Sequence, residues 1–302
     1  MRRKTFGRDL GLSIRMALAL LPILALYAVA VFIAFATLLI ALADGDVVAI
    51  LSWFFFALCF GVIFFVHVLR GDQLVLRSAG AKTVERRDEK DLEDLVHRVA
   101  ATADVPPPRV ALIRSRAPNA LAVGLRPKRA TVALTTELVQ RLEPEELSAV
   151  VAHEIAHIAN RDGIVMTFVS GPSMLGALMR DEGGSRGPVF FYVFYWPVYL
   201  LGIVLMWAIS RYREYTADRG SALITGAPEQ LMSALTKIAE KGPRGDLRGG
   251  AAVSALCIVP AQRKRGRLDV LRRFEIFMDH PPLDKRLRRL GEIASEMGRP
   301  VR

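Results

Sequence analysis

Residues 153–157, His-Glu-Ile-Ala-His, constrain this chain of 302 residues more than any other stretch. They match the pattern H-E-x-x-H, which depends on an α-helix because residues four apart then lie about 40° apart around the axis. Both imidazoles can therefore bind one Zn²⁺ from two corners of a tetrahedron, while Glu154 can reach a water at the metal. An ordinary core helix with two buried histidines is the alternative interpretation.

The flanking residues predict where this helix begins and how it packs. Pro144 suits the first helical turn, and the neighbouring glutamates suit the positive end of the helix dipole. Apolar side chains then recur at helical spacing at Leu147, Val150, Val151, Ile155 and Ile158. Because the imidazoles lie beside this stripe, we expect a half-buried helix with a polar edge on a cleft.

A catalytic zinc site needs a third protein ligand and an open position. One common continuation of the motif places glycine and histidine three and six residues after the second histidine, but Asn160 and Gly163 stand there. The other continuation places a glutamate on a later helix, and Glu214 fits it. Asp218 follows four residues later on the same helix face, where it can hydrogen-bond a ligand histidine.

Long apolar runs predict two membrane hairpins. Residues 16–43, 47–69 and 188–210 are each long enough for a helix that crosses a bilayer, whereas 164–179 is of marginal length. Positive charge flanks the first two runs on their outer sides and is missing from the turn between them. This asymmetry places the N-terminus and the chain after Arg70 in the cytoplasm.

The composition agrees with a membrane protein. Hydrophobic residues make up 52% of the chain, and the mean hydropathy is +0.30. The net charge of +11 fits basic cytoplasmic flanks. Residues 262–273 are rich in arginine without a recognised nucleic-acid motif, so we expect a solvated face or contact with anionic headgroups of the lipid bilayer, and no binding of nucleic acid. Two distant cysteines make no disulfide framework and favour a reducing compartment.

Four separate motifs, in order, resemble HtpX-type integral-membrane zinc endopeptidases, which are relatives of the CAAX prenyl endopeptidase. They are Asn119–Gly124 (N-A-x-A-x-G), residues 153–157, Ser210–Asp218 (S-R-x-R-E-x-x-A-D) and His280–Arg286 (H-P-P-L-x-x-R). The resemblance covers roughly residues 10–290. It implies protein or peptide substrates, chiefly misfolded or damaged membrane proteins, and a role in membrane protein quality control.

We therefore predict a mainly α, multi-pass protein of the cell membrane, with its active site on the cytoplasmic side. Two transmembrane helical hairpins (four helices) accompany a cytoplasmic α+β gluzincin-like zinc-peptidase domain with a small sheet. The predicted parts are the tail and first hairpin (1–70), a first catalytic segment (71–162), the second hairpin (163–210) and a second catalytic segment (211–302). Within the first catalytic segment we expect a helix around 92–103 and strands at 109–113, 120–125 and 130–135.

The predicted reaction is hydrolysis of a peptide bond. One Zn²⁺ per chain, bound by His153, His157 and Glu214, would lower the pKa of its water. Glu154 would take the proton as general base and pass it to the leaving amine. The alternative is an intramembrane protease of the site-2 type, in which the motif lies inside a membrane span. The charged residues of the segment 141–146, which leads into the motif, argue against it.

Further site residues follow from the resemblance and from the strands. The resemblance places His280 and Arg286 near the site, and one of them is expected to stabilise the oxyanion, unless His280 only packs. The segment 119–122 is the expected substrate-binding edge, since an extended peptide can add to a sheet as a strand; its residues are Asn119, Ala120, Leu121 and Ala122. The alternative is a sheet that only packs under the helix.

A non-catalytic membrane protein, whose basic cytoplasmic face binds lipid or partner proteins, is the rival of a different class. In that interpretation the metal motif is degenerate. The presence of both Glu154 and Glu214 argues against it.

Overall fold

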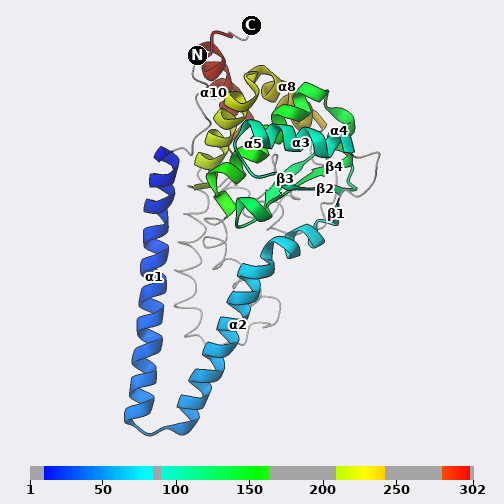
Figure 1. Ribbon diagram of the computed structural model, residues 1–302. Helices are drawn as coiled ribbons and strands as arrows, with labels where there is room; N and C mark the ends of the chain where they lie inside the picture. Colours follow the sequence, from blue (N-terminus) through cyan, green and yellow to red (C-terminus); the bar gives the residue numbers. More distant parts are fainter. Residues whose placement is uncertain (1–9, 84–89, 164–208, 242–280, 300–302) are drawn as a thin grey trace.

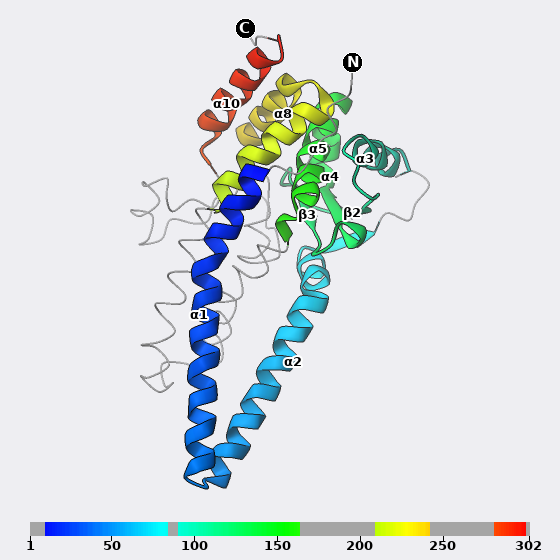
Figure 2. The same ribbon diagram turned by 60° about the vertical axis from the view of Figure 1, so that its left-hand side comes forward.

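The computed structural model describes residues 10–83, 90–163, 209–241 and 281–299, which form a long helical hairpin and an α+β head (Figure 1). Helices α1 (Leu10–Ala43) and α2 (Val47–Ser78) are the two arms of the hairpin. They meet at a turn far from the head in both views (Figure 2). The indole Nε1 of Trp53 donates a hydrogen bond to the Ala34 carbonyl at 2.7 Å, which ties the arms together.

Large apolar side chains are exposed along the hairpin. Phe32, Val48 and Phe55 are 71%, 74% and 62% exposed, respectively. Over the described residues, no helix combines the length and the mean hydropathy required of a membrane span. The predicted crossings at 16–43 and 47–69 are therefore not confirmed, and the second predicted hairpin lies almost wholly outside the described residues.

The head contains a four-stranded sheet in the order β1-β2-β4-β3. Its strands are β1 (Ala81–Thr83), β2 (Arg109–Ile113), β3 (Ala120–Val123) and β4 (Thr131–Thr135). Strands β2 and β4 run parallel, and the other two pairs are antiparallel. The three predicted strands are confirmed to within two residues, and β3 lies at an edge of the described sheet. The three-residue β1 was not predicted.

Alternating side chains of the sheet enter two separate cores. Val110, Val132 and Leu134 pack with α3 (Lys90–Thr102) and α5 (Pro144–Asn160). On the opposite face, Ile113 and Leu121 pack with the end of α2. The helix predicted near 92–103 is thus confirmed, and the period-two alternation explains how one short sheet supports both layers.

Helix α5 begins at Pro144, as predicted, after a capping box between Glu143 and Glu146. The expectation of a half-buried helix is wrong, because every residue from Glu146 onward is buried except Ser148 and Ala159. Helix α5 packs against α3, α8 (Pro228–Lys241) and strands β3 and β4. It also contacts the helical residues 209–225 through Ser221. The helical spacing of apolar residues in the sequence predicted only one buried face of α5.

Polar contacts hold these helices together. Glu146 accepts hydrogen bonds from Ser233 at 2.6 Å and from Lys237 at 2.8 Å, which joins α5 to α8. Ser221 donates to the Ala149 carbonyl at 2.7 Å, which joins the 209–225 helix to α5. The C-terminal helix α10 (Leu283–Glu296) packs against α8. Short elements complete the head: the helix α4 (Thr136–Arg141) and the 3₁₀ turn η2 (Pro127–Arg129).

Candidate metal centre

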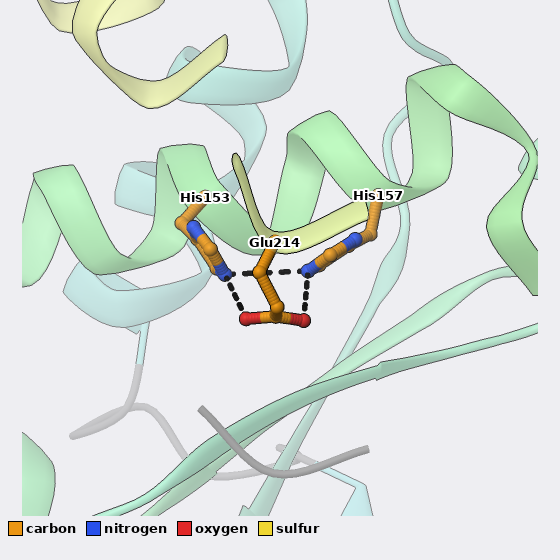
Figure 3. A group of neighbouring side chains, drawn as sticks. All are labelled: His153, His157 and Glu214. Carbon is orange, nitrogen blue, oxygen red and sulfur yellow. Dashed lines mark hydrogen bonds and ion pairs between the residues drawn. The ribbon is translucent and has the colours of Figure 1, made fainter. Parts of the chain in front are cut away.

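Three side chains predicted as ligands meet between α5 and the 209–225 helix (Figure 3). The Nε2 atoms of His153 and His157 lie 3.2 Å apart. The two carboxylate oxygens of Glu214 lie 3.5 Å from the His153 nitrogen and 3.6 Å from the His157 nitrogen. All three residues are buried, so this group could hold a metal ion shielded from bulk water.

The outer nitrogen of each imidazole faces a carboxylate. Nδ1 of His157 lies 2.6 Å from Asp162, and Nδ1 of His153 lies 3.1 Å from Asp218. A carboxylate at Nδ1 favours the tautomer with its proton there, which leaves the Nε2 lone pair directed inward. Asp218 thus lies beside His153, where we expected it to contact a ligand histidine, whereas Asp162 was not predicted.

Each of these carboxylates is in turn paired with a buried arginine. Arg286 donates to Asp218 from Nε at 2.9 Å and from Nη2 at 2.6 Å, and its Nη1 lies 3.6 Å from Glu214. Arg213 lies with Nε 2.9 Å from Asp162. Because an unpaired buried charge is costly, these arginines allow the site to keep both carboxylates ionised.

The path of the chain after α5 brings Asp162 back to the site. Residues five apart on a continuous helix lie about 140° apart around the axis, so Asp162 would point away from His157. The helix instead ends at Arg161, which adopts the left-handed conformation with φ 60° and ψ 35°. The following residue can then turn its side chain toward the imidazole.

Burial and charge shift the pKa values in the centre. Burial lowers the pKa of His153, but Asp218 and Glu214 outweigh it and raise the pKa to about 9. Burial also raises the carboxyl pKa values of Asp162 and Asp218, yet their arginine and histidine partners hold both below the usual range. The metal-free centre therefore holds ionised carboxylates around a proton that a metal ion would have to displace.

Glu154 lies next to His153 in the sequence and is buried, with 2% of its surface exposed. Burial raises its pKa, and the charge of Glu214 acts in the same direction, whereas the two histidines oppose them. Its carboxylate also accepts a hydrogen bond from the backbone of Ala122 in β3. This contact places the expected general base directly against the edge strand.

The remaining predicted residues have different positions. Arg286 reaches the centre, but its guanidinium holds carboxylates there. His280 lies outside the described residues. Asn119 is 3% exposed, and its side-chain oxygen accepts the Ala120 N–H at 2.9 Å, which closes the start of β3. Leu121 points into the core on the far face of the sheet.

A comparison with protein families identifies the fold. Residues 86–294 match the family model of peptidase family M48, which is more than half of the chain. The chain belongs to peptidase family M48. This M48 chain is 37% identical to "Protease HtpX homolog" of Moorella thermoacetica, with 98% of both chains covered. It is 35% identical to "Protease HtpX homolog 2" of Methanosarcina acetivorans, covering 98% of this chain and 100% of the relative.

A solved structure is also similar to this M48 chain. The crystal structure of Ste24p from S. mikatae superposes with a TM-score of 0.50 at 20% sequence identity, covering 94% of this chain and 67% of that one. At that identity the likeness concerns the fold, which is mainly helical. The family and the relatives together confirm the predicted resemblance and identify a membrane-associated metallopeptidase, a hydrolase of peptide bonds.

Proposed function

We propose that this M48 chain is a zinc-dependent endopeptidase of the cell membrane that cleaves membrane proteins as part of quality control. The observation that carries the proposal is the approach of two imidazole Nε2 atoms to 3.2 Å beside the Glu214 carboxylate. Two inward lone pairs at this distance repel each other unless a cation or a proton lies between them. The centre therefore favours positive charge at its middle.

The spacing of the donor atoms fits Zn²⁺. Zinc–nitrogen distances of about 2.0–2.1 Å in a tetrahedron place two ligand nitrogens roughly 3.3–3.4 Å apart. The two imidazoles are 3.2 Å apart, and each carboxylate oxygen lies 3.5 or 3.6 Å from one of them. Two neutral imidazoles and one carboxylate also form a common donor set for catalytic zinc. His153, His157 and Glu214 would thus hold one ion per chain.

The chain's own residues supply the proton transfers. Bound zinc would polarise the peptide carbonyl and make the attacking water more acidic. Glu154 accepts the proton of that water and then donates it to the leaving amine, so that one carboxylate serves both steps. Its raised pKa suits this role, since a general base works best when its pKa lies near the working pH.

The edge strand β3 offers backbone carbonyl groups for an extended substrate. The Asn119 carbonyl accepts from Thr135 in β4, so alternation along the strand directs the backbone of Ala120 and Ala122 to the free edge. The Ala122 N–H already meets Glu154 there. A peptide that pairs with residues 119–122 would pass directly by the general base.

The oxyanion donor is assigned by elimination between the two expected residues. Arg286 uses Nε and Nη2 to bind Asp218 and holds Nη1 3.6 Å from Glu214. A guanidinium engaged in this way supports the ligands, so we assign it to the metal centre. The oxyanion role is then expected of His280.

Membrane insertion of the hairpin is supported by its surface. Exposed apolar side chains cover both arms, with Phe32 71% and Leu58 67% exposed, and a water-exposed hairpin of this kind would be unstable. We therefore propose that residues 1–70 anchor the enzyme and that residues 163–210 form a second hairpin. The metal centre would then face the cytoplasm, in accordance with the basic outer flanks.

The proposal can be tested on detergent-purified protein. We expect about one zinc per chain by elemental analysis and cleavage of casein that chelation stops and added zinc restores. His153→Ala, His157→Ala and Glu214→Ala should lose both zinc and cleavage. Glu146→Gln, a buried change on the same helix, serves as the control and should keep its zinc. Full zinc in the Glu214 variant would remove that residue from the centre.

A cysteine placed at Asp46, in the turn of the hairpin, tests the membrane arrangement. We expect a membrane-impermeant thiol reagent to label it from the outer side of intact cells only. Labelling from the cytoplasmic side would overturn the proposed orientation.

A further inference from the structure

The imidazole of His157 contacts a buried ion pair, Asp162 and Arg213, which has no role in the proposed mechanism. Oδ2 of Asp162 lies 2.6 Å from His157 Nδ1 and 2.9 Å from Nε of Arg213. Asp162 is 1% exposed and Arg213 is 4% exposed. One carboxylate oxygen thus meets both the imidazole and the guanidinium, away from bulk water.

The other histidine ligand has the same sequence of contacts, from imidazole to carboxylate to guanidinium. Nδ1 of His153 faces Asp218, which accepts hydrogen bonds from Arg286. The two chains of contacts share the 209–225 helix but use it differently. In the first, this helix supplies the arginine, Arg213, and the end of α5 supplies the aspartate; in the second, it supplies the aspartate, Asp218, and α10 supplies the arginine. The same arrangement, built twice with the roles of the elements exchanged, indicates a shared task at the metal centre.

Stability alone does not account for the pair. A buried ion pair contributes little net stability, because desolvation offsets the attraction. The left-handed turn at Arg161 that delivers Asp162 is also unfavourable for a residue with a side chain, at roughly 1–2 kcal/mol. The desolvation of the ion pair and the left-handed backbone at Arg161 therefore indicate a role other than stability, such as orienting a metal ligand.

We propose that the Asp162–Arg213 pair is a positioning pair for the metal centre, an inference that rests on the zinc site proposed above. Asp162 accepts the Nδ1–H of His157, so that the Nε2 lone pair points at the middle of the centre. Arg213 fixes the carboxylate. Because Arg213 directly precedes Glu214, the pair also ties the helix of the third ligand to the end of α5.

Zinc affinity of the full chain in detergent tests this inference, measured by competition with a chromophoric chelator. Partners of this kind are typically worth about 10- to 100-fold in metal affinity, and we expect a loss of that size for Asp162→Ala. Asp162→Asn should lose less, since its amide oxygen still accepts the Nδ1–H. Arg213→Gln should also lose less, since it acts through Asp162. The visible spectrum of the Co²⁺-loaded protein should shift in the Asp162 variants, because His157 is reoriented.

Glu146→Gln is the matched control, since Glu146 is a buried carboxylate on α5 with a lysine partner and no contact to a ligand. It should lower thermal stability without changing zinc affinity or the Co²⁺ spectrum. Asp162→Ala with zinc affinity within about twofold of wild type and an unshifted spectrum would overturn the inference. If that variant does not fold, the nearly isosteric Asp162→Asn decides by the same two readouts. A wild type without zinc affinity would overturn the proposed function itself, and the pair with it.

Discussion

The backbone N–H of Ala122 donates a hydrogen bond to the carboxylate of Glu154. One contact therefore links the edge strand of the sheet to the residue that we propose as general base. It favours the ionised form of Glu154 against the effect of burial. It also means that a peptide pairing with β3 would lie next to the carboxylate that activates water.

Arg286 should be essential for the stability of the head. Arg286→Met would leave Asp218 and Glu214 buried without their guanidinium partner, and breaking such a pair typically costs about 3–5 kcal/mol. Arg286→Lys keeps the charge but loses the two-pronged contact, so an intermediate loss is expected. Denaturant unfolding of the metal-free protein measures both.

Arg299→Met is the control for that comparison. Arg299 pairs with Glu229 at 3.0 Å, but its side chain is 56% exposed, so the change should cost less than about 1 kcal/mol. Equal losses for the two methionine variants would show that Arg286 is no more than a surface contact in energetic terms.

The metal-free protein should become less stable as the pH rises above 6.5. The pKa of His153 is raised from 6.5 to about 9, so the folded state binds this proton more tightly than the unfolded state. The resulting stability is fully present below pH 6.5 and is lost as the pH rises through 9. Thermal unfolding in the presence of a chelator should follow this course, with a change of at most about 3 kcal/mol.

His153→Gln isolates that effect, because it removes the proton-binding group and should flatten the profile between pH 6.5 and 9. Zinc should reverse the trend in the wild type. The ion competes with the proton, so its affinity should rise with pH over the same interval. A metal-free profile that is already flat in the wild type would contradict the assigned shift.

Gly163 should tolerate no side chain. A Cβ at this position would lie 2.2 Å from the Gly124 carbonyl oxygen at the end of β3, so Gly163→Ala must displace backbone. Such overpacking typically costs about 1–3 kcal/mol. A fall in the thermal midpoint is the expected result, together with weaker zinc binding, because the neighbouring Asp162 contacts His157.

Gly291→Ala provides the opposite case. A Cβ there meets nothing within 4 Å, and the residue lies inside α10. This change should stabilise the protein by roughly 0.4–1 kcal/mol. Stabilisation by both substitutions would contradict the close contact between Gly163 and Gly124.

The sequence was most informative where a short motif requires one particular backbone conformation. H-E-x-x-H requires a helix, and Pro144 with the adjacent glutamates placed its start correctly. Glu214 and Asp218 were found because a spacing of four residues on a later helix is itself a recognisable pattern. The structure brings both to the histidines.

The remaining features depend on contacts that no local pattern contains. Asp162 lies five residues after His157, on the wrong face of a continuous helix, and only the left-handed turn at Arg161 makes its contact possible. Arg213 is a fixed position of the S-R-x-R-E-x-x-A-D motif, but its role followed only from its contact with Asp162. The burial of α5 results from packing against α3, α8, the sheet and the 209–225 helix, which periodicity within α5 cannot reveal.

The strand β1 was missed for a similar reason. Three residues are too few to show alternation, and β1 exists because Ala81–Thr83 pair with β2 as the chain leaves α2. Sheet order is likewise a tertiary property. We expected residues 119–122 to form an edge, and in the described sheet β3 lies at an edge next to β4.

In the proposed site, His153, His157 and Glu214 hold zinc while Glu154 moves the proton. The most direct test measures zinc content and peptide turnover on the same preparations of Glu154→Gln and Glu214→Gln. Glu154→Gln should keep about one zinc per chain and lose roughly 10²- to 10⁴-fold in turnover, because an amide cannot accept the proton. Glu214→Gln should lose zinc as well as turnover, since a neutral amide is a poor zinc ligand. A Glu154→Gln protein with full zinc and near-normal turnover would contradict the account.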